Sequence, residues 1–137
     1  MQVVHAALQS HPGKPAHPDA ISRCVETCLT CAGACTACAD ACLSERHIEG
    51  LLACIRIDLD CAAICIGTGS VVARAKAGAS RQVLEGQLAV CIAACRACAE
   101  ECRRHANMHE HCRVCAEACE ACAEACNDML SALRRIV

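Results

Sequence analysis

The cysteines of this chain recur at steps of three, four or seven residues, and this spacing constrains the fold more than any other feature. The chain has 18 cysteines in 137 residues, and they fall into four groups. Steps of three and four place side chains on one face of an α-helix, whereas a β-strand would need steps of two. The residues between them are rich in Ala, Glu, Arg and Leu, which favour helix. The sequence therefore predicts four helices, each with one face of cysteines.

Helix-breaking and capping residues separate the four groups and predict where the helices end. The predicted helices cover about residues 20–43, 45–77, 81–105 and 108–135. They form one domain of residues 19–137, preceded by a leader of residues 1–18 with a short helix and a linker interrupted by proline. Short connections favour antiparallel neighbours. The predicted fold is therefore all-α, an antiparallel up-down-up-down four-helix bundle with a Cys-lined core.

Extending each cysteine face by the same steps predicts two different ends for this bundle. At one end the extension reaches Ile21, Val72, Leu84, Leu88, Met129 and Leu133. We call these residues the apolar plug and expect them to close that end. At the other end the extension reaches His47, His105, Met108, His109 and His111. We call this end the mouth and expect it to be polar and rich in metal-binding groups.

Most cysteines have a second cysteine four residues away, which brings two sulfurs together on one helical face. The eight pairs are 24/28, 31/35, 38/42, 61/65, 91/95, 98/102, 115/119 and 122/126. Only Cys54 and Cys112 lack such a partner; Asp58 stands four residues after the first, and Met108 four residues before the second. Both exceptions fall towards the mouth.

This density of thiols indicates a soft metal. Thiolates must lose their protons to bind, and a core of unpaired buried anions would be prohibitive, so the metal must neutralise them. One Cu(I) per thiolate gives a neutral interior, whereas tetrahedral zinc with four terminal thiolates leaves two negative charges per site. Cysteine with supporting methionine also selects Cu(I) among the common cellular metals. We therefore expect many Cu(I) ions, about one per thiol.

All the cysteines are predicted metal ligands: Cys24, Cys28, Cys31, Cys35, Cys38, Cys42, Cys54, Cys61, Cys65, Cys91, Cys95, Cys98, Cys102, Cys112, Cys115, Cys119, Cys122 and Cys126. His105, His109 and Met108 are candidate further ligands at the mouth. Asp58 is expected to hydrogen-bond to the metal-binding cysteines rather than to bind the metal itself, because a carboxylate is a hard ligand. His47 and His111 are candidates for the same supporting role or for metal uptake.

The remaining composition argues against several other classes of protein. A net charge of −2 with scattered basic residues offers no surface for nucleic acid or an anionic membrane. We expect no transmembrane helix, and the start of the chain does not resemble a secretory signal, which predicts a cytoplasmic location. In a reducing cytosol such cysteines indicate metal rather than disulfides. No nucleophile with an orienting base and no phosphate-binding loop is present, so we do not expect an enzyme.

Two other functions remain open alongside copper binding. An iron–sulfur electron carrier would also use thiolates, although the ferredoxin pattern of Cys-x-x-Cys-x-x-Cys ending in Cys-Pro is missing. A zinc or cadmium thiolate buffer is the second alternative. Colour and sulfide content on purification would reveal iron–sulfur clusters, and a metal titration would distinguish the second alternative.

The pattern resembles a known family, the cytosolic copper storage proteins, which are four-helix-bundle proteins of bacteria. The resemblance rests on the Cys-x-x-x-Cys pattern of the helices and on the segment ECRRH at residues 101–105 running into MHEHC at residues 108–112, and it covers about residues 20–130. It implies storage and sequestration of Cu(I), bound mainly by two cysteines per ion, for copper supply or detoxification. It also implies assembly into homotetramers.

Overall fold

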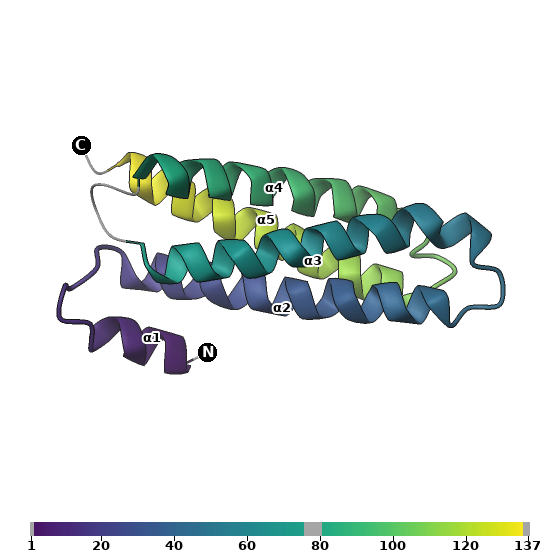
Figure 1. Ribbon diagram of the computed structural model, residues 1–137, viewed down its shortest axis with the longest axis horizontal. Coiled ribbons are helices and arrows are strands. Elements are labelled where there is room, and N and C mark those ends of the chain that lie inside the picture. The colour runs from purple at the N-terminus through teal and green to yellow at the C-terminus, as the bar shows by residue number, and fades with distance from the viewer. Residues whose placement is uncertain (1, 76–80, 136–137) are drawn as a thin grey trace.

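The computed structural model describes residues 2–75 and 81–135, and all regular structure in these residues is helical. This confirms the predicted all-α class. The elements are α1 (Gln2–Gln9), α2 (Pro18–Leu43), the 3-10 turn η1 (Glu49–Leu51), α3 (Leu52–Ala73), α4 (Arg81–Arg103) and α5 (Glu110–Arg134). Figure 1 shows the long helices α2 to α5 side by side, with the short α1 lying along α2 near one end.

The four long helices surround a common interior. Helix α2 packs against α3 and α5, and α4 packs against the same two helices. The start of α2, the end of α3, the start of α4 and the end of α5 all lie at one end in Figure 1, while the turns after α2 and after α4 lie at the other. Residues of the apolar plug therefore belong to the first end, and the histidines of residues 105–111 belong to the second.

The turn after α2 is longer than the sequence predicted, so α3 begins at Leu52 and not at residue 45. The amide of Glu45 donates to the carbonyl of Cys42 at 3.2 Å, which continues the end of α2 instead of opening a new helix. The amide of Leu51 then donates to Ile48 at 2.8 Å and closes the 3-10 turn η1. Leu51 is buried in this turn and fixes it against the core.

Two other predicted boundaries differ by about two residues. Helix α4 ends at Arg103 and not at 105, and α5 begins at Glu110 and not at 108. The amides of Met108 and His109 both donate to the carbonyl of His105, which makes these residues a turn between the helices. The predicted end of the third helix at residue 77 lies outside the described residues, and α3 ends at Ala73.

Helix α4 bears on the expectation that the chain has no transmembrane helix. By length and composition it is apolar enough to cross one, because its cysteines count as apolar side chains. The same composition is found in buried core helices. In the structure Leu84, Leu88 and all four cysteines of α4 are buried, and the helix packs against α3 and α5. Its apolar face is therefore accounted for by the interior of the protein.

The apolar plug is buried as predicted. Its exposed fractions are 1% for Ile21, 0% for Val72, 2% for Leu84, 0% for Leu88, 1% for Met129 and 8% for Leu133. With no aromatic residue in the chain, these residues other than Leu133 are among the largest fully buried side chains. The plug therefore supplies much of the apolar packing that holds the metal-free protein together.

Truncating the plug is expected to destabilise the metal-free protein. Leu88→Ala removes a fully buried side chain and leaves a cavity, which should cost about 3 kcal/mol of unfolding free energy. Anaerobic urea unfolding followed by circular dichroism measures it. The control is Leu43→Ala, the same change at a side chain that is 55% exposed, which should cost less than about 0.5 kcal/mol. Equal losses in the two variants would contradict a closed apolar end.

Candidate metal centre

The interior between the four helices is lined with sulfur. All 18 cysteines are unpaired thiols and all are buried, with exposed fractions of 0% or 1%. The three- and four-residue steps place them on the inner faces of α2 to α5, as the sequence predicted. Buried thiols at this density form a continuous thiol core, which extends from the apolar plug to the mouth.

The closest sulfur contacts join different helices. Cys119 on α5 lies 3.6 Å from both Cys31 and Cys35 on α2. On the other side of the core, Cys65 on α3 lies 3.7 Å from Cys95 on α4. Contacts within one helix also occur, at 3.9 Å for Cys31 and Cys35. The Cys-x-x-x-Cys pairs of the sequence are therefore joined to one another across the core.

These contacts gather the sulfurs into groups of four. In each group the four sulfurs lie within 4.8 Å of one another, and every member is buried. One group takes a single cysteine from each long helix: Cys31, Cys65, Cys95 and Cys122. Another, at the mouth, consists of Cys38, Cys42, Cys54 and Cys112. Such spacing suits soft metal ions bridged by thiolates, because neighbouring ions can share ligands.

Asp58 lies inside the thiol core, and its exposed fraction is 0%. Its Oδ1 accepts hydrogen bonds from the thiols of Cys98 at 3.2 Å, Cys115 at 3.3 Å and Cys102 at 3.5 Å. Its Oδ2 lies 3.9 Å from the sulfur of Cys54. Burial raises the pKa of Asp58 to about 8, and negative charge at Cys115 acts in the same direction. Asp58 therefore joins thiols from α3, α4 and α5.

Burial also changes the acidity of the thiols at the mouth. It raises the pKa of Cys42 to about 11, with negative charge at Cys54 adding to the effect. It raises the pKa of Cys112 as well. Deeper in the core, a hydrogen bond from Cys126 acts in the opposite direction and lowers the pKa of Cys24 to about 5. Cys42 and Cys112 therefore carry their protons at neutral pH, and a metal ion must displace them.

His111 is the histidine that the structure brings to the thiols. Its Nδ1 lies 3.4 Å from the sulfur of Cys38 and 3.6 Å from that of Cys112. Its Nε2 lies 2.9 Å from Oε2 of Glu45, in the turn after α2. The hydrogen bond with His111 and the nearby His109 hold the pKa of Glu45 below its usual value. Glu45 was not among the predicted site residues, because in the sequence it stands far from the histidines of α5.

The other predicted mouth residues lie further from the thiols. His105 pairs with Glu101 at 2.9 Å, and His109 pairs with Glu45 at 3.1 Å. His109 and His111 stack with their ring centroids 5.4 Å apart. Met108 is 84% exposed, and His47 is also exposed. The structure therefore places His111 against the thiols, and His105 and His109 around the rim of the mouth.

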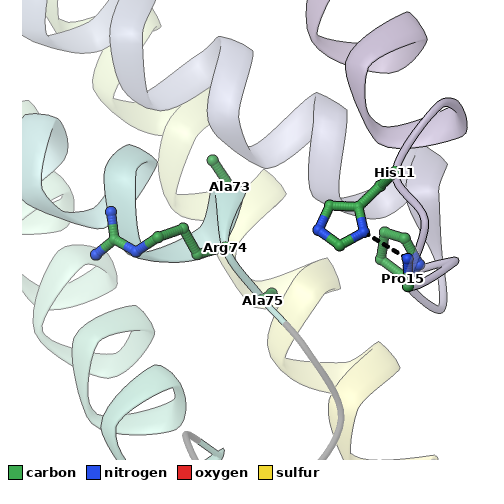
Figure 2. Close-up of a pocket in the computed structure, with 6 residues that line it drawn as sticks. His11, Pro15, Ala73, Arg74 and Ala75 are labelled. Carbon is green, nitrogen blue, oxygen red and sulfur yellow. Dashed lines mark hydrogen bonds between the residues drawn. The ribbon is translucent and has the colours of Figure 1, made fainter.

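Three further histidines belong to the leader and lie away from the thiol core. His5 lies 3.3 Å from Asp19, and His17 immediately precedes α2. Figure 2 shows His11 facing the end of α3 at Ala73–Ala75, across a small pocket that Pro15 also lines. The Nδ1 of His11 accepts a hydrogen bond from the amide of Gly13 at 2.8 Å. No cysteine lines this pocket, so it is separate from the candidate metal centre.

The chain matches a known protein family over most of its length. The model of the copper storage protein family matches residues 17–131, which include every cysteine of the thiol core. This chain belongs to the copper storage protein family. The matched range also confirms the resemblance that the cysteine pattern and the two mouth segments indicated.

Solved structures of this family are similar to the chain along most of its length. The copper storage protein Ccsp from Streptomyces lividans, loaded with 10 copper equivalents, is 48% identical and covers 95% of this chain and 99% of its own, with a TM-score of 0.90. A cytosolic copper storage protein from the same organism, with five coppers, is 52% identical and covers 82% and 93%, with a TM-score of 0.79. The Cu(I)-bound copper storage protein BsCsp3 is 35% identical and covers 80% and 97%, with a TM-score of 0.71.

Proposed function

We propose that this protein stores and sequesters Cu(I) by binding it with thiolates in the space between its four long helices. The stored copper would serve copper supply, detoxification or both. The observation that carries the proposal is the thiol core, where buried sulfurs from all four long helices lie within 4.8 Å of one another in groups of four. Membership of the copper storage protein family supports it, and similar proteins have been solved with bound copper.

The oxidation state and the amount of copper follow from charge. A buried thiolate needs a compensating charge, and one Cu(I) per thiolate supplies it without excess. The similar protein BsCsp3 is described as Cu(I)-bound, and a Streptomyces relative as carrying 10 copper equivalents. We therefore propose Cu(I) as the stored ion and about one ion per thiol as the full load.

The ligands in this proposal are the 18 cysteines, with His111 joining Cys38 and Cys112 at the mouth. Proximity to two sulfurs supports that role for His111. His105, His109 and Met108 remain predicted ligands for ions arriving at the rim, and His47 a predicted residue of uptake. Asp58 is proposed to organise the thiols around it, because it already accepts hydrogen bonds from three of them.

The arrangement suits uptake at one end and storage along the whole core. We propose an antiparallel up-down-up-down four-helix bundle for residues 19–137, preceded by the leader of residues 1–18. An ion bound at the mouth can pass between neighbouring thiol groups by ligand exchange, and the apolar plug closes the far end. We assign the protein to the cytosol, because a similar Streptomyces protein is described as cytosolic. We propose no catalytic role.

Anaerobic titration of the fully reduced protein tests the storage function. Cu(I) is added against a competing chromophoric chelator, and Zn(II) is titrated separately in the same way. We expect about 18 Cu(I) per chain, one for each thiol, held more tightly than Zn(II). Saturation at a handful of Cu(I) with tighter divalent binding would contradict storage and favour a zinc or cadmium buffer. Acid-labile sulfide in the purified protein would instead favour an iron–sulfur carrier.

We also propose that the chain assembles into a homotetramer, as the family resemblance implies. In this assembly the outer face of α3 forms part of the interface between subunits. Leu52, Leu59 and Ile66 recur every seven residues along α3 and are 43%, 51% and 56% exposed. Its inner face carries cysteines, so α3 is apolar on both sides, which is typical of a helix buried on both sides. By contrast, α5 exposes Glu117 and Glu120.

A charge on this face is expected to separate the subunits. Leu59→Glu should convert tetramers to smaller species, because assembly would bury the new carboxylate. Size-exclusion chromatography with light scattering measures the mass. The control is Val114→Glu, on α5, where the side chain is 48% exposed and the mass should not change. A tetramer that persists in Leu59→Glu, or a wild-type monomer, would contradict this interface.

A further inference from the structure

Glu45 connects two parts of the mouth that are far apart in the sequence. It stands in the turn between α2 and α3, whereas His109 and His111 stand at the start of α5. Its Oε2 lies 2.9 Å from Nε2 of His111 and 3.1 Å from Nδ1 of His109. One carboxylate oxygen therefore faces a nitrogen of each imidazole.

These contacts decide where the hydrogens of the two rings lie. An ionised carboxylate only accepts hydrogen bonds, so the nitrogen of each ring that faces Glu45 carries a hydrogen. A neutral His111 with its hydrogen on Nε2 has a free lone pair on Nδ1. That Nδ1 is the atom that lies 3.4 Å from the sulfur of Cys38 and 3.6 Å from that of Cys112. The lone pair of His111 therefore faces the first thiols of the core.

The stacking of the two rings adds a second constraint. The rings of His109 and His111 lie 5.4 Å apart at an interplanar angle of 29°. His109 presents Nδ1 to Glu45, while His111 presents Nε2. The same carboxylate therefore favours opposite tautomers in two adjacent histidines, and only His111 turns its Nδ1 towards the core.

We propose that Glu45 is a positioning residue, which holds His111 as the Nε2–H tautomer so that its Nδ1 and the sulfurs of Cys38 and Cys112 form the first receiving site for Cu(I). The inference rests on the proposed storage function, because that function identifies the metal as Cu(I). Without the carboxylate, a hydrogen on Nδ1 would point at the thiols and would have to move before the metal could bind. Carboxylates that hold metal-binding histidines in this way typically contribute about 10- to 100-fold in affinity.

The first test needs no metal. Long-range ¹H–¹⁵N NMR of the reduced, copper-free protein reports which nitrogen of each histidine carries the hydrogen. We expect His111 as the Nε2–H tautomer in the wild type and a mixture of tautomers in Glu45→Ala. Glu45→Gln keeps an acceptor oxygen and should restore most of the wild-type pattern. The control is Glu49→Ala, an exposed glutamate of the neighbouring turn, which should leave the pattern unchanged. An unchanged His111 tautomer in Glu45→Ala would overturn the proposal.

The second test uses Cu(I). With one equivalent of Cu(I) per chain and a competing chelator, Glu45→Ala should bind about 10- to 100-fold more weakly than the wild type, with Glu45→Gln in between. The total load should stay the same, because the deeper thiols are untouched. Equal affinity of all variants for the first equivalent would overturn the role of Glu45 and leave storage intact. A wild-type protein that takes up no Cu(I) would instead contradict the proposed function, while the metal-free NMR result still reports on Glu45.

Discussion

Anaerobic loading with Cu(I) is expected to raise the melting temperature of this protein by more than about 20 °C. The folded chain holds buried sulfurs in groups of four within 4.8 Å, a geometry that the unfolded chain does not keep. An ion that binds only the folded state stabilises it by about 2.7 kcal/mol when its free concentration is 100 times its dissociation constant. Five such ions would contribute more than about 10 kcal/mol, and each kcal/mol raises the melting temperature by at least about 2 °C.

The physical reason lies in what the metal replaces. The copper-free interior has no aromatic side chain, and its thiols contact one another at 3.6 Å or more. Contacts between thiols are weak hydrogen bonds, whereas thiolate–metal bonds are strong and join the helices directly. Copper should therefore act as the main cross-link between α2, α3, α4 and α5.

Differential scanning calorimetry under nitrogen measures this effect. The reduced protein is scanned alone, after stepwise addition of Cu(I), and after removal of the copper by a strong chelator, which should return the melting temperature to its starting value. Zn(II) serves as the comparison and should give a smaller rise at equal occupancy. A shift of only a few degrees at full copper load would contradict a core built around the metal.

Much of this structure could be predicted from the cysteine spacing alone. Steps of three and four residues fix the helical period and the buried face together, and the plug residue Leu88 followed from extending the same steps. Asp58 was found in the same way, as the residue four positions after Cys54, and it lies among the thiols. A periodic pattern specifies which side of a helix is inner, since every residue on that side obeys the same rule.

The parts that could not be predicted depend on contacts between helices. The 3.6 Å approach of Cys119 to Cys31 needs the relative height of α5 and α2, which spacing within one helix does not determine. The turn that contains Glu45 was predicted as helix, and its pairing with His111 on α5 has no local signal. Met108 stood at the right step before Cys112, yet it lies in the turn before α5 and is exposed. Local periodicity stops being informative where a helix ends.

The second large effect is expected from Asp58→Asn in the copper-free protein, which should raise the unfolding free energy by about 4 kcal/mol at pH 7. Burial raises the pKa of the Asp58 carboxyl to about 8, whereas an aspartate in the unfolded chain titrates near 3.8. Between these values the folded state binds a proton that the unfolded state has lost, so stability falls as the pH rises. Each pH unit over this range costs about 1.4 kcal/mol. An asparagine has no such titration.

The substitution also keeps the local hydrogen bonds. The amide oxygen of asparagine can occupy the place of Oδ1 and accept from the thiols of Cys98, Cys102 and Cys115. Its NH₂ group then takes the place of Oδ2, 3.9 Å from the sulfur of Cys54, where it can donate to that sulfur. The variant therefore removes the titrating carboxyl group without leaving the neighbouring thiols unpaired.

Urea unfolding of the reduced, copper-free proteins at a series of pH values measures the difference. The two proteins should be nearly equal in stability at pH 4, and the advantage of Asp58→Asn should grow as the pH rises towards 8, because the wild type loses stability over that range. Asp60→Asn, the same change at an exposed position of α3, is the control and should show no such growth. If Asp58→Asn is no more stable than the wild type at pH 8, the prediction is wrong, and Asp58 is held as a carboxylate that the surrounding thiols stabilise. The thiol core would then carry a fixed negative charge at Asp58 before copper binds.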